Sequence, residues 1–177
     1  MCGIAGVYNL DLKAVDKSVL SKMNESMFLR GPDDDGYYYH KNFAMAMRRL
    51  SIIDLKKGKQ PISNKEKTIH VVFNGEIYNY IELKKNLSKK GYSFLTNSDT
   101  EVIIKLYEEY GLNAVDYLNG MFSFSLYDEN KQRLWIARDR LGIKPLYYFK
   151  NSECFAFASD LNALAKHPLL QKNLDIE

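Results

Sequence analysis

The strands expected in the C-terminal third constrain the fold of this chain most. Residues 122–127 alternate apolar and polar side chains, a pattern typical of a strand with one buried face. Further strands are expected at 134–137, 146–149 and 154–158, two of them apolar on both faces. A strand that is apolar on both faces needs a covering layer on each side. The chain is therefore expected to fold into several stacked layers.

The rest of the chain adds short strands and amphipathic helices. We expect strands at Gly3 to Tyr8, Tyr37 to His40, Phe43 to Met47 and Thr68 to Phe73, and helices at Val15 to Phe28, at Ile77 to Lys89 and from Val102 to a stop at Gly111. Hairpin-like connections occur around residues 128–130 and 150–152. About eight or nine strands and four helices, with such hairpins, favour an α+β fold of antiparallel sheets packed with helices.

Two local patterns in the middle of the chain can be interpreted structurally. The dipeptide Asn74-Gly75 predicts a turn that ends a strand, leads into a helix and leaves backbone N–H groups where they suit an anion. Ser98-Asp99-Thr100-Glu101 is a capping-box pattern, in which Asp99 is an acid of the first helical turn. The acidic triplet 33–35 is expected to be a polar turn, because no second ligand cluster or calcium-loop spacing accompanies it.

Composition excludes several functional classes. A chain of 177 residues with 46% hydrophobic and 27% charged residues suits one globular domain, 1–177, that needs no structural metal or disulfide. A net charge of +3 is too small to indicate nucleic-acid binding. No apolar run approaches the roughly 18 residues of a membrane span. The two cysteines form no disulfide or metal-ligand pattern, which favours a reducing compartment, the cytoplasm.

The first four residues, Met1-Cys2-Gly3-Ile4, hold the strongest chemical signal. Removal of Met1 would place a thiol and a free α-amine on Cys2, and both groups titrate close enough to neutrality to exchange a proton. Cys2 would then be a nucleophile that carries its own base. Taken alone, Cys2 is more simply a small buried residue that begins a strand.

Several motifs together carry a family resemblance. In chain order they are Met1-Cys2-Gly3-Ile4-Ala5-Gly6, Arg30-Gly31-Pro32-Asp33, Arg49-Leu50-Ser51-Ile52-Ile53-Asp54, Gln60-Pro61, Phe73-Asn74-Gly75-Glu76-Ile77-Tyr78-Asn79, Ser98-Asp99-Thr100-Glu101, Gly120-Met121-Phe122 and Arg138-Asp139-x-x-Gly142-x-x-Pro145-Leu146. From Cys2 to about Ala165 the sequence resembles the glutaminase domain, a class II glutamine amidotransferase, of glutamine-hydrolysing asparagine synthetases. The resemblance implies the four-layer αββα sandwich of N-terminal-nucleophile hydrolases.

The resemblance also implies a catalytic set. Cys2, freed from Met1, matches the nucleophile that attacks the side-chain amide of L-glutamine, and its α-amine matches the proton carrier. Asn74, through its side-chain amide, and Gly75, through its backbone N–H, match the oxyanion hole. The alternative for this dipeptide is a plain turn.

Substrate-binding residues follow in the same way. Arg49 matches the residue that binds the substrate α-carboxylate, and Asp99 matches the acid that pairs with the α-ammonium. Glu76 and backbone groups of three hydrophobic residues are expected beside the bound glutamine: Leu50, Ile52 and Ile53. The sequence departs from the family at three positions where a histidine is common, which here hold Leu29, Met47 and Asn97.

The expected function is hydrolysis of L-glutamine to glutamate and ammonia through a Cys2 thioester. The ammonia would supply asparagine-synthetase-type amidation of aspartate on an ATP-dependent synthetase domain or subunit, which this chain lacks. This domain is expected to need no metal or cofactor, since ATP and magnesium would serve only the missing domain. A homodimer stays open, and so do two alternatives: a non-catalytic glutamine-binding module, and an N-terminal-nucleophile amidase for another amide.

Overall fold

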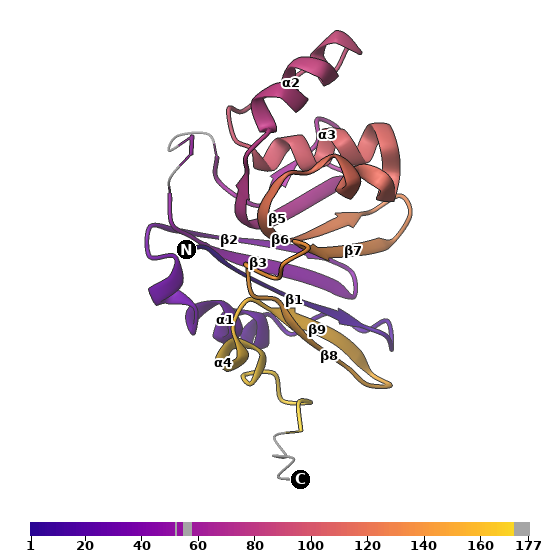
Figure 1. Ribbon diagram of the computed structural model, residues 1–177. Coiled ribbons are helices and arrows are strands. Elements are labelled where there is room, and N and C mark those ends of the chain that lie inside the picture. Colours follow the sequence, from indigo (N-terminus) through magenta and orange to yellow (C-terminus); the bar gives the residue numbers. More distant parts are fainter. Residues whose placement is uncertain (52, 55–57, 172–177) are drawn as a thin grey trace.

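Two antiparallel sheets lie face to face in the computed structural model, which describes residues 1–51, 53–54 and 58–171 (Figure 1). The first sheet, in spatial order, consists of β2 (Asp34–His40), β3 (Phe43–Arg49), β1 (Gly3–Asn9), β9 (Cys154–Ala158) and β8 (Tyr147–Lys150). The second consists of β4 (Ile62–Ser63), β5 (Ile69–Ile77), β6 (Gly120–Asp128) and β7 (Arg133–Arg138). Every pairing between these strands is antiparallel.

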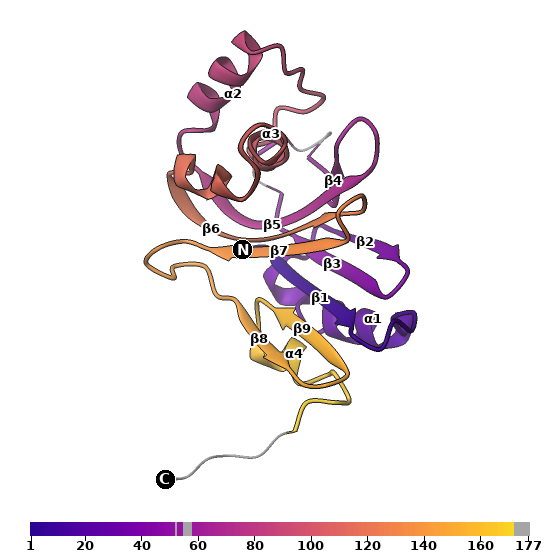
Figure 2. The ribbon, with the colours of Figure 1, turned by 90° about the vertical axis from the view of Figure 1, so that its right-hand side faces the viewer.

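Helices cover the outer face of each sheet, as Figure 2 shows. Helices α1 (Lys17–Glu25) and α4 (Leu161–Leu164) pack on the first sheet, and α2 (Tyr80–Lys89) and α3 (Thr100–Tyr110) lie on the side of the second. Short 3₁₀ turns occupy Phe28–Arg30 and Gly111–Tyr117. The order of layers is αββα, so the sandwich expected from the sequence is confirmed.

The core is divided among the three interfaces between layers. A cluster between the sheets joins Ile4, Met45 and Phe157 of the first sheet to Val72 and Tyr127 of the second, all at most 1% exposed. Separate clusters lie under α3 and under α1. Both sheets are thus covered on both faces, as the apolar strands of the C-terminal third predict.

The expected turn at Asn74-Gly75 is wrong. Strand β5 continues to Ile77, with Asn74 opposite Ser123 and Gly75 opposite Phe122 in β6. Helix α2 begins only at Tyr80, so no helix start lies beside the dipeptide. A Cβ on residue 75 would lie 2.2 Å from the Met121 carbonyl oxygen, which means that glycine here permits close packing of two strands.

Other boundaries differ more modestly. The first helix is shorter than 15–28, because the Asp16 carboxylate accepts the Ser18 N–H at 2.8 Å and caps it there. Strand β2 begins at Asp34, opposite Arg49, so two of the three residues of the expected acidic turn are in a strand. Strand β4 was not predicted. The stop at Gly111 is confirmed by its φ of 61°.

A polar cluster ties the two sheets together at one edge. The Glu129 carboxylate, in the turn after β6, accepts the Tyr38 hydroxyl of β2 at 2.7 Å and lies 2.9 Å from His70 Nε2 of β5. The other ring nitrogen of His70 lies 2.8 Å from the Ser63 hydroxyl. His40 Nδ1 is 3.5 Å from the same carboxylate. One acidic side chain therefore joins groups from both sheets.

Candidate functional site

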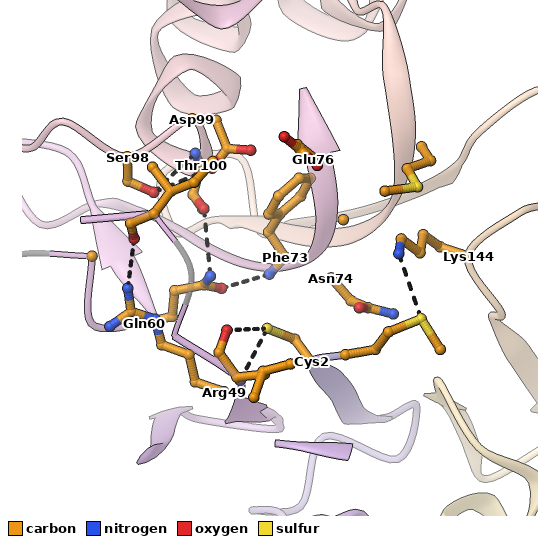
Figure 3. A pocket seen from close by; sticks show the side chains of 16 residues that line it. Cys2, Arg49, Gln60, Phe73, Asn74, Glu76, Ser98, Asp99, Thr100 and Lys144 are labelled. Atoms are coloured by element: carbon orange, nitrogen blue, oxygen red, sulfur yellow. Dashed lines mark hydrogen bonds between the residues drawn. The ribbon is translucent and has the colours of Figure 1, made fainter. Parts of the chain in front are cut away.

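A pocket of about 650 Å³ opens where the two sheets meet the start of α3 (Figure 3). Cys2 comes from the residue before β1, and Arg49 from the last position of β3. Asn74 and Gly75 come from the second half of β5, and Asp99 directly precedes α3. Segments far apart in the sequence, all singled out by motif, are brought together in one cavity.

The Cys2 thiol is held by the main chain of Leu50. The Leu50 N–H donates to Sγ at 3.4 Å, and the thiol lies 3.6 Å from the Leu50 carbonyl oxygen. Burial raises the pKa of the Cys2 thiol, while the Leu50 N–H, the chain's terminal ammonium and Arg49 act in the opposite direction. A half-buried thiol of this kind needs a base to become a nucleophile.

The side chain of Asn74 has an unused hydrogen-bond donor inside the pocket. Asn74 is 1% exposed, and its Nδ2 has no partner among the described residues. Figure 3 places this amide beside Cys2. A buried donor without a partner costs about 1–3 kcal/mol, so one that lies inside a pocket is a candidate for contact with a ligand.

The edge of β5 presents a second donor. Strand β4 pairs with β5 only as far as Val71. Beyond Val71, side chains accept the N–H groups of this edge of β5. Gln60 Oε1 accepts the Phe73 N–H at 2.7 Å, and Asp99 Oδ2 accepts the Ile77 N–H at 3.0 Å. Alternate N–H groups of a strand point to the same edge. The Gly75 N–H therefore points to this edge too, between the two capped positions and on the pocket side.

Arg49 and Asp99, two residues of opposite charge type, lie on the side of the pocket away from Lys144, another lining residue (Figure 3). Arg49 is 5% exposed, and its Nη2 donates to the carbonyl oxygens of Ile53 at 2.9 Å and Asp54 at 3.0 Å. Asp99 is 4% exposed, and burial raises the pKa of its carboxyl, as does the nearby Glu76. Within the described part of the chain no ion pair joins either side chain to another.

The remaining predicted residues divide into three cases. Leu50 and Ile53 line the pocket through the contacts already given, and Glu76 is exposed at its rim. Ile52 lies outside the described residues. The predicted capping box is wrong in detail: the Ser98 hydroxyl accepts the Thr100 N–H at 3.2 Å, but the Glu101 carboxylate accepts N–H groups of the preceding loop at 95 and 96.

Sequence reasoning missed two polar lining residues. Gln60 is 6% exposed, and only the Gln60-Pro61 motif signalled it. Lys144 is 7% exposed, with its Nζ 3.5 Å from Met1 Sδ, and it lies inside a motif to which the sequence assigned no role.

The three positions that lack a family histidine differ in burial. Leu29 and Asn97 are exposed, and Met47 is buried between the sheets.

Fold and pocket together define the class of the protein. A four-layer αββα sandwich with a pocket at the start of its central strand is the fold of N-terminal-nucleophile hydrolases. The family of this chain follows from its sequence: it belongs to the glutamine amidotransferase domain family, whose model matches residues 1–177.

Sequence similarity to two named proteins is consistent with this family assignment. The chain is 43% identical to asparagine synthetase [glutamine-hydrolyzing] 1 of Bacillus subtilis, over 100% of this chain and 28% of the relative. It is 42% identical to asparagine synthetase B [glutamine-hydrolyzing] of Escherichia coli, over 93% of this chain and 30% of the relative. The chain therefore spans less than a third of the length of these relatives.

A solved structure supports the fold independently. Glutamine phosphoribosylpyrophosphate amidotransferase from B. subtilis superposes with a TM-score of 0.79 at 20% identity, over 93% of this chain and 43% of that one.

No helix among the described residues is long and apolar enough to cross a membrane. In the same part of the chain, no group of three or more acidic, histidine or cysteine side chains is placed to hold a metal ion.

Proposed function

We propose that Cys2, once Met1 is removed, hydrolyses L-glutamine to glutamate and ammonia. The observation that carries the proposal is the unpartnered Asn74 amide, buried in the same pocket as the thiol. A donor held free beside a nucleophile suits the negative oxygen that forms when a carbonyl is attacked. The Gly75 N–H supplies a second donor to the same oxygen.

The first half of the reaction forms a thioester. Cys2 Sγ attacks the side-chain amide carbon of glutamine, and the thiol proton passes to the Cys2 α-amine. Asn74 and Gly75 hold the resulting oxyanion. The intermediate collapses as the C–N bond breaks, and the α-ammonium returns its proton to the departing nitrogen, which leaves as ammonia.

The second half releases glutamate. A water molecule attacks the thioester carbon and gives its proton to the Cys2 α-amine, and the same two donors stabilise the second oxyanion. Breaking of the C–S bond then frees glutamate, and the α-ammonium returns its proton to the departing sulfur, which regenerates the thiol. All groups in this sequence belong to the chain or to its substrates, so the proposed half-reaction requires no metal or cofactor.

Specificity for a free amino acid rests on the two charges of the pocket. Arg49 would bind the α-carboxylate by a fork-shaped contact, and Asp99 would pair with the α-ammonium. The carbonyl groups of Ile53 and Asp54 fix the guanidinium in place for this contact. Holding both ends of the substrate presents its amide to Cys2.

The destination of the ammonia is part of the same proposal. The relatives are named as asparagine synthetases and are more than three times as long as the part matched here. We infer that the ammonia passes to an ATP-dependent domain or subunit that amidates aspartate, in a reducing cytoplasm that keeps the thiol free.

One preparation can test the proposal. Intact mass shows whether Met1 is absent, and ammonia release from glutamine is measured on the same sample. We expect activity only in the form that begins at Cys2, and Cys2→Ala should abolish hydrolysis while glutamine still binds. Parent-like ammonia release by Cys2→Ala would exclude Cys2 as the nucleophile, whereas binding without hydrolysis by processed parent protein would indicate a glutamine-binding module.

A further inference from the structure

Gln60 is a buried amide that lines the pocket. It is 6% exposed, and its Oε1 accepts the Phe73 N–H of β5 at 2.7 Å. Its Nε2 lies 3.4 Å from the Thr100 hydroxyl, at the first residue of α3. Figure 3 shows the side chain extended between these two partners. One side chain thus joins the edge of a strand to the start of a helix.

The main chain of Gln60 is fixed from the opposite side. A Cβ on Gly36 in β2 would lie 1.9 Å from the Gln60 carbonyl oxygen, so the two backbones are in direct contact. Residue 60 is therefore held against the first sheet while its side chain reaches the second. A displacement of Gln60 would therefore disturb its contact with β2 in the first sheet or with β5 in the second.

The placement of Gln60 matters because of the strand edge that it caps. Phe73 lies two residues before Gly75, and its N–H is on the edge that also carries the Gly75 N–H. Asp99 caps Ile77 on the other side of Gly75, but Asp99 also has the proposed task of binding the substrate ammonium. Gln60 is the cap of this edge that has no assigned contact with the substrate.

We propose that Gln60 is a positioning residue for the oxyanion hole, one that fixes the β5 edge so that Asn74 and Gly75 aim their donors at the reacting oxygen. The inference rests on the proposed glutaminase function. Donors of this kind lose most of their effect when they are misplaced by about 1 Å. A purely structural Gln60 would affect folding stability and leave the oxyanion contacts unchanged.

Gln60→Met tests the inference, because methionine has a similar length but neither accepts nor donates as the amide does. We expect kcat to fall about 10- to 100-fold with KM changed by less than about threefold. Gln60→Glu keeps an acceptor for the Phe73 N–H and should recover part of the loss. Gln171→Met, the same change at an exposed glutamine, is the matched control and should behave as the parent.

A second readout separates positioning from general disturbance. Glutamate γ-semialdehyde carries an aldehyde where glutamine has its amide; Cys2 Sγ adds to the carbonyl carbon, and the oxygen of the tetrahedral adduct occupies the oxyanion hole. Gln60→Met should weaken this adduct by about the factor by which it lowers kcat. Glutamine affinity, measured in a Cys2→Ala background, should stay the same.

Each outcome decides one claim. If the processed parent releases no ammonia, the proposed function fails, and with it the basis of this inference. If the parent is active and Gln60→Met keeps its kcat and its adduct affinity, or loses glutamine affinity to the same extent, Gln60 does not position the donors. If Gln60→Met does not fold, Gln60→Asn, one methylene too short for Phe73, should show the same two losses, and parent-like values would overturn the inference.

Discussion

At the scale of single residues, the site contains groups whose polar atoms are poorly satisfied by the protein itself. Asn74 keeps a buried donor without a partner, and burial works against the charged form of Asp99. Each is costly to folding and useful to a ligand that supplies the missing contact.

Removal of the Asn74 donor should affect turnover far more than binding. We expect Asn74→Ala to lower kcat about 10²- to 10³-fold, the usual effect of losing one oxyanion donor, with a small change in KM. Steady-state ammonia release measures both. Asn130→Ala, at an exposed asparagine in a turn, is the control. A KM defect with an unchanged kcat would place Asn74 in ground-state binding instead.

The Asp99 carboxyl should make both stability and binding depend on pH. Because burial raises its pKa, the ionised side chain lowers folding stability at pH values above that pKa, and protonation removes this cost. Asp99→Asn should therefore raise the thermal midpoint at neutral pH, with the gain vanishing below the ordinary pKa of 3.8. In the parent, KM for glutamine should rise as the pH falls toward the raised pKa. A KM that stays flat from neutral pH down to the ordinary pKa of 3.8 would contradict the pairing with the substrate ammonium.

At the scale of elements, β5 has two functions along its length. Its first half, up to Phe73, belongs to the core between the layers, and its second half supplies the donors of the pocket. Pairing with β6 runs through both halves without a break. The site is therefore as rigid as the sheet that carries it, which favours precise placement of donors.

Gly75 should tolerate no side chain. A Cβ there would lie 2.2 Å from the Met121 carbonyl oxygen, so we expect Gly75→Ala to lower the free energy of unfolding by about 2 kcal/mol or more and to abolish ammonia release. Urea unfolding measures the first effect. Gly91→Ala is the comparison, since that glycine has a φ of 96° but open space around it, and about 1 kcal/mol with full activity is expected. A loss at Gly75→Ala no larger than at Gly91→Ala would mean that the neighbouring strand moves aside and that packing does not require glycine at 75.

The sequence predicted the layers and most of the strands because apolar alternation survives in the folded sheets. The turn predicted at Asn74-Gly75 was wrong because the turn preference of this dipeptide is local, whereas nine residue pairs between β5 and β6 hold the segment extended. The sequence missed β4, whose two residues are too few for a period to appear. The sequence assigned no role to Gln60, because its contact with β5 is a hydrogen bond from the Phe73 backbone N–H, and no side-chain motif reveals such a contact.

At the scale of the whole molecule, the two sheets are joined by apolar packing over most of their area and by the Glu129 cluster at one edge. Burial opposes ionisation of Glu129, but the hydrogen bonds from Tyr38 and His70 outweigh it and lower the pKa of the carboxyl. The ionised group therefore stabilises the fold above its ordinary pKa of 4.5, and this contribution is lost as the pH falls through the lowered value.

Glu129→Gln should weaken the connection between the sheets while the pocket stays intact. We expect a loss of about 1.5–3 kcal/mol in the free energy of unfolding near pH 7, the usual worth of a hydrogen bond to a charged group, and little difference from the parent in strong acid. Urea unfolding at several pH values measures it. A loss that is the same at every pH would show that the charge contributes nothing.

The place of the proposed nucleophile in the fold has a practical consequence for anyone who makes this protein. Cys2 immediately precedes β1, the middle strand of its sheet, which pairs with β3 on one side and β9 on the other. A purification tag joined ahead of Met1 would leave that strand free to fold and would still occupy the amine that the proposed chemistry needs. Such a preparation would look correct by every measure of folding and would be silent in an ammonia assay until the tag was cut to expose Cys2.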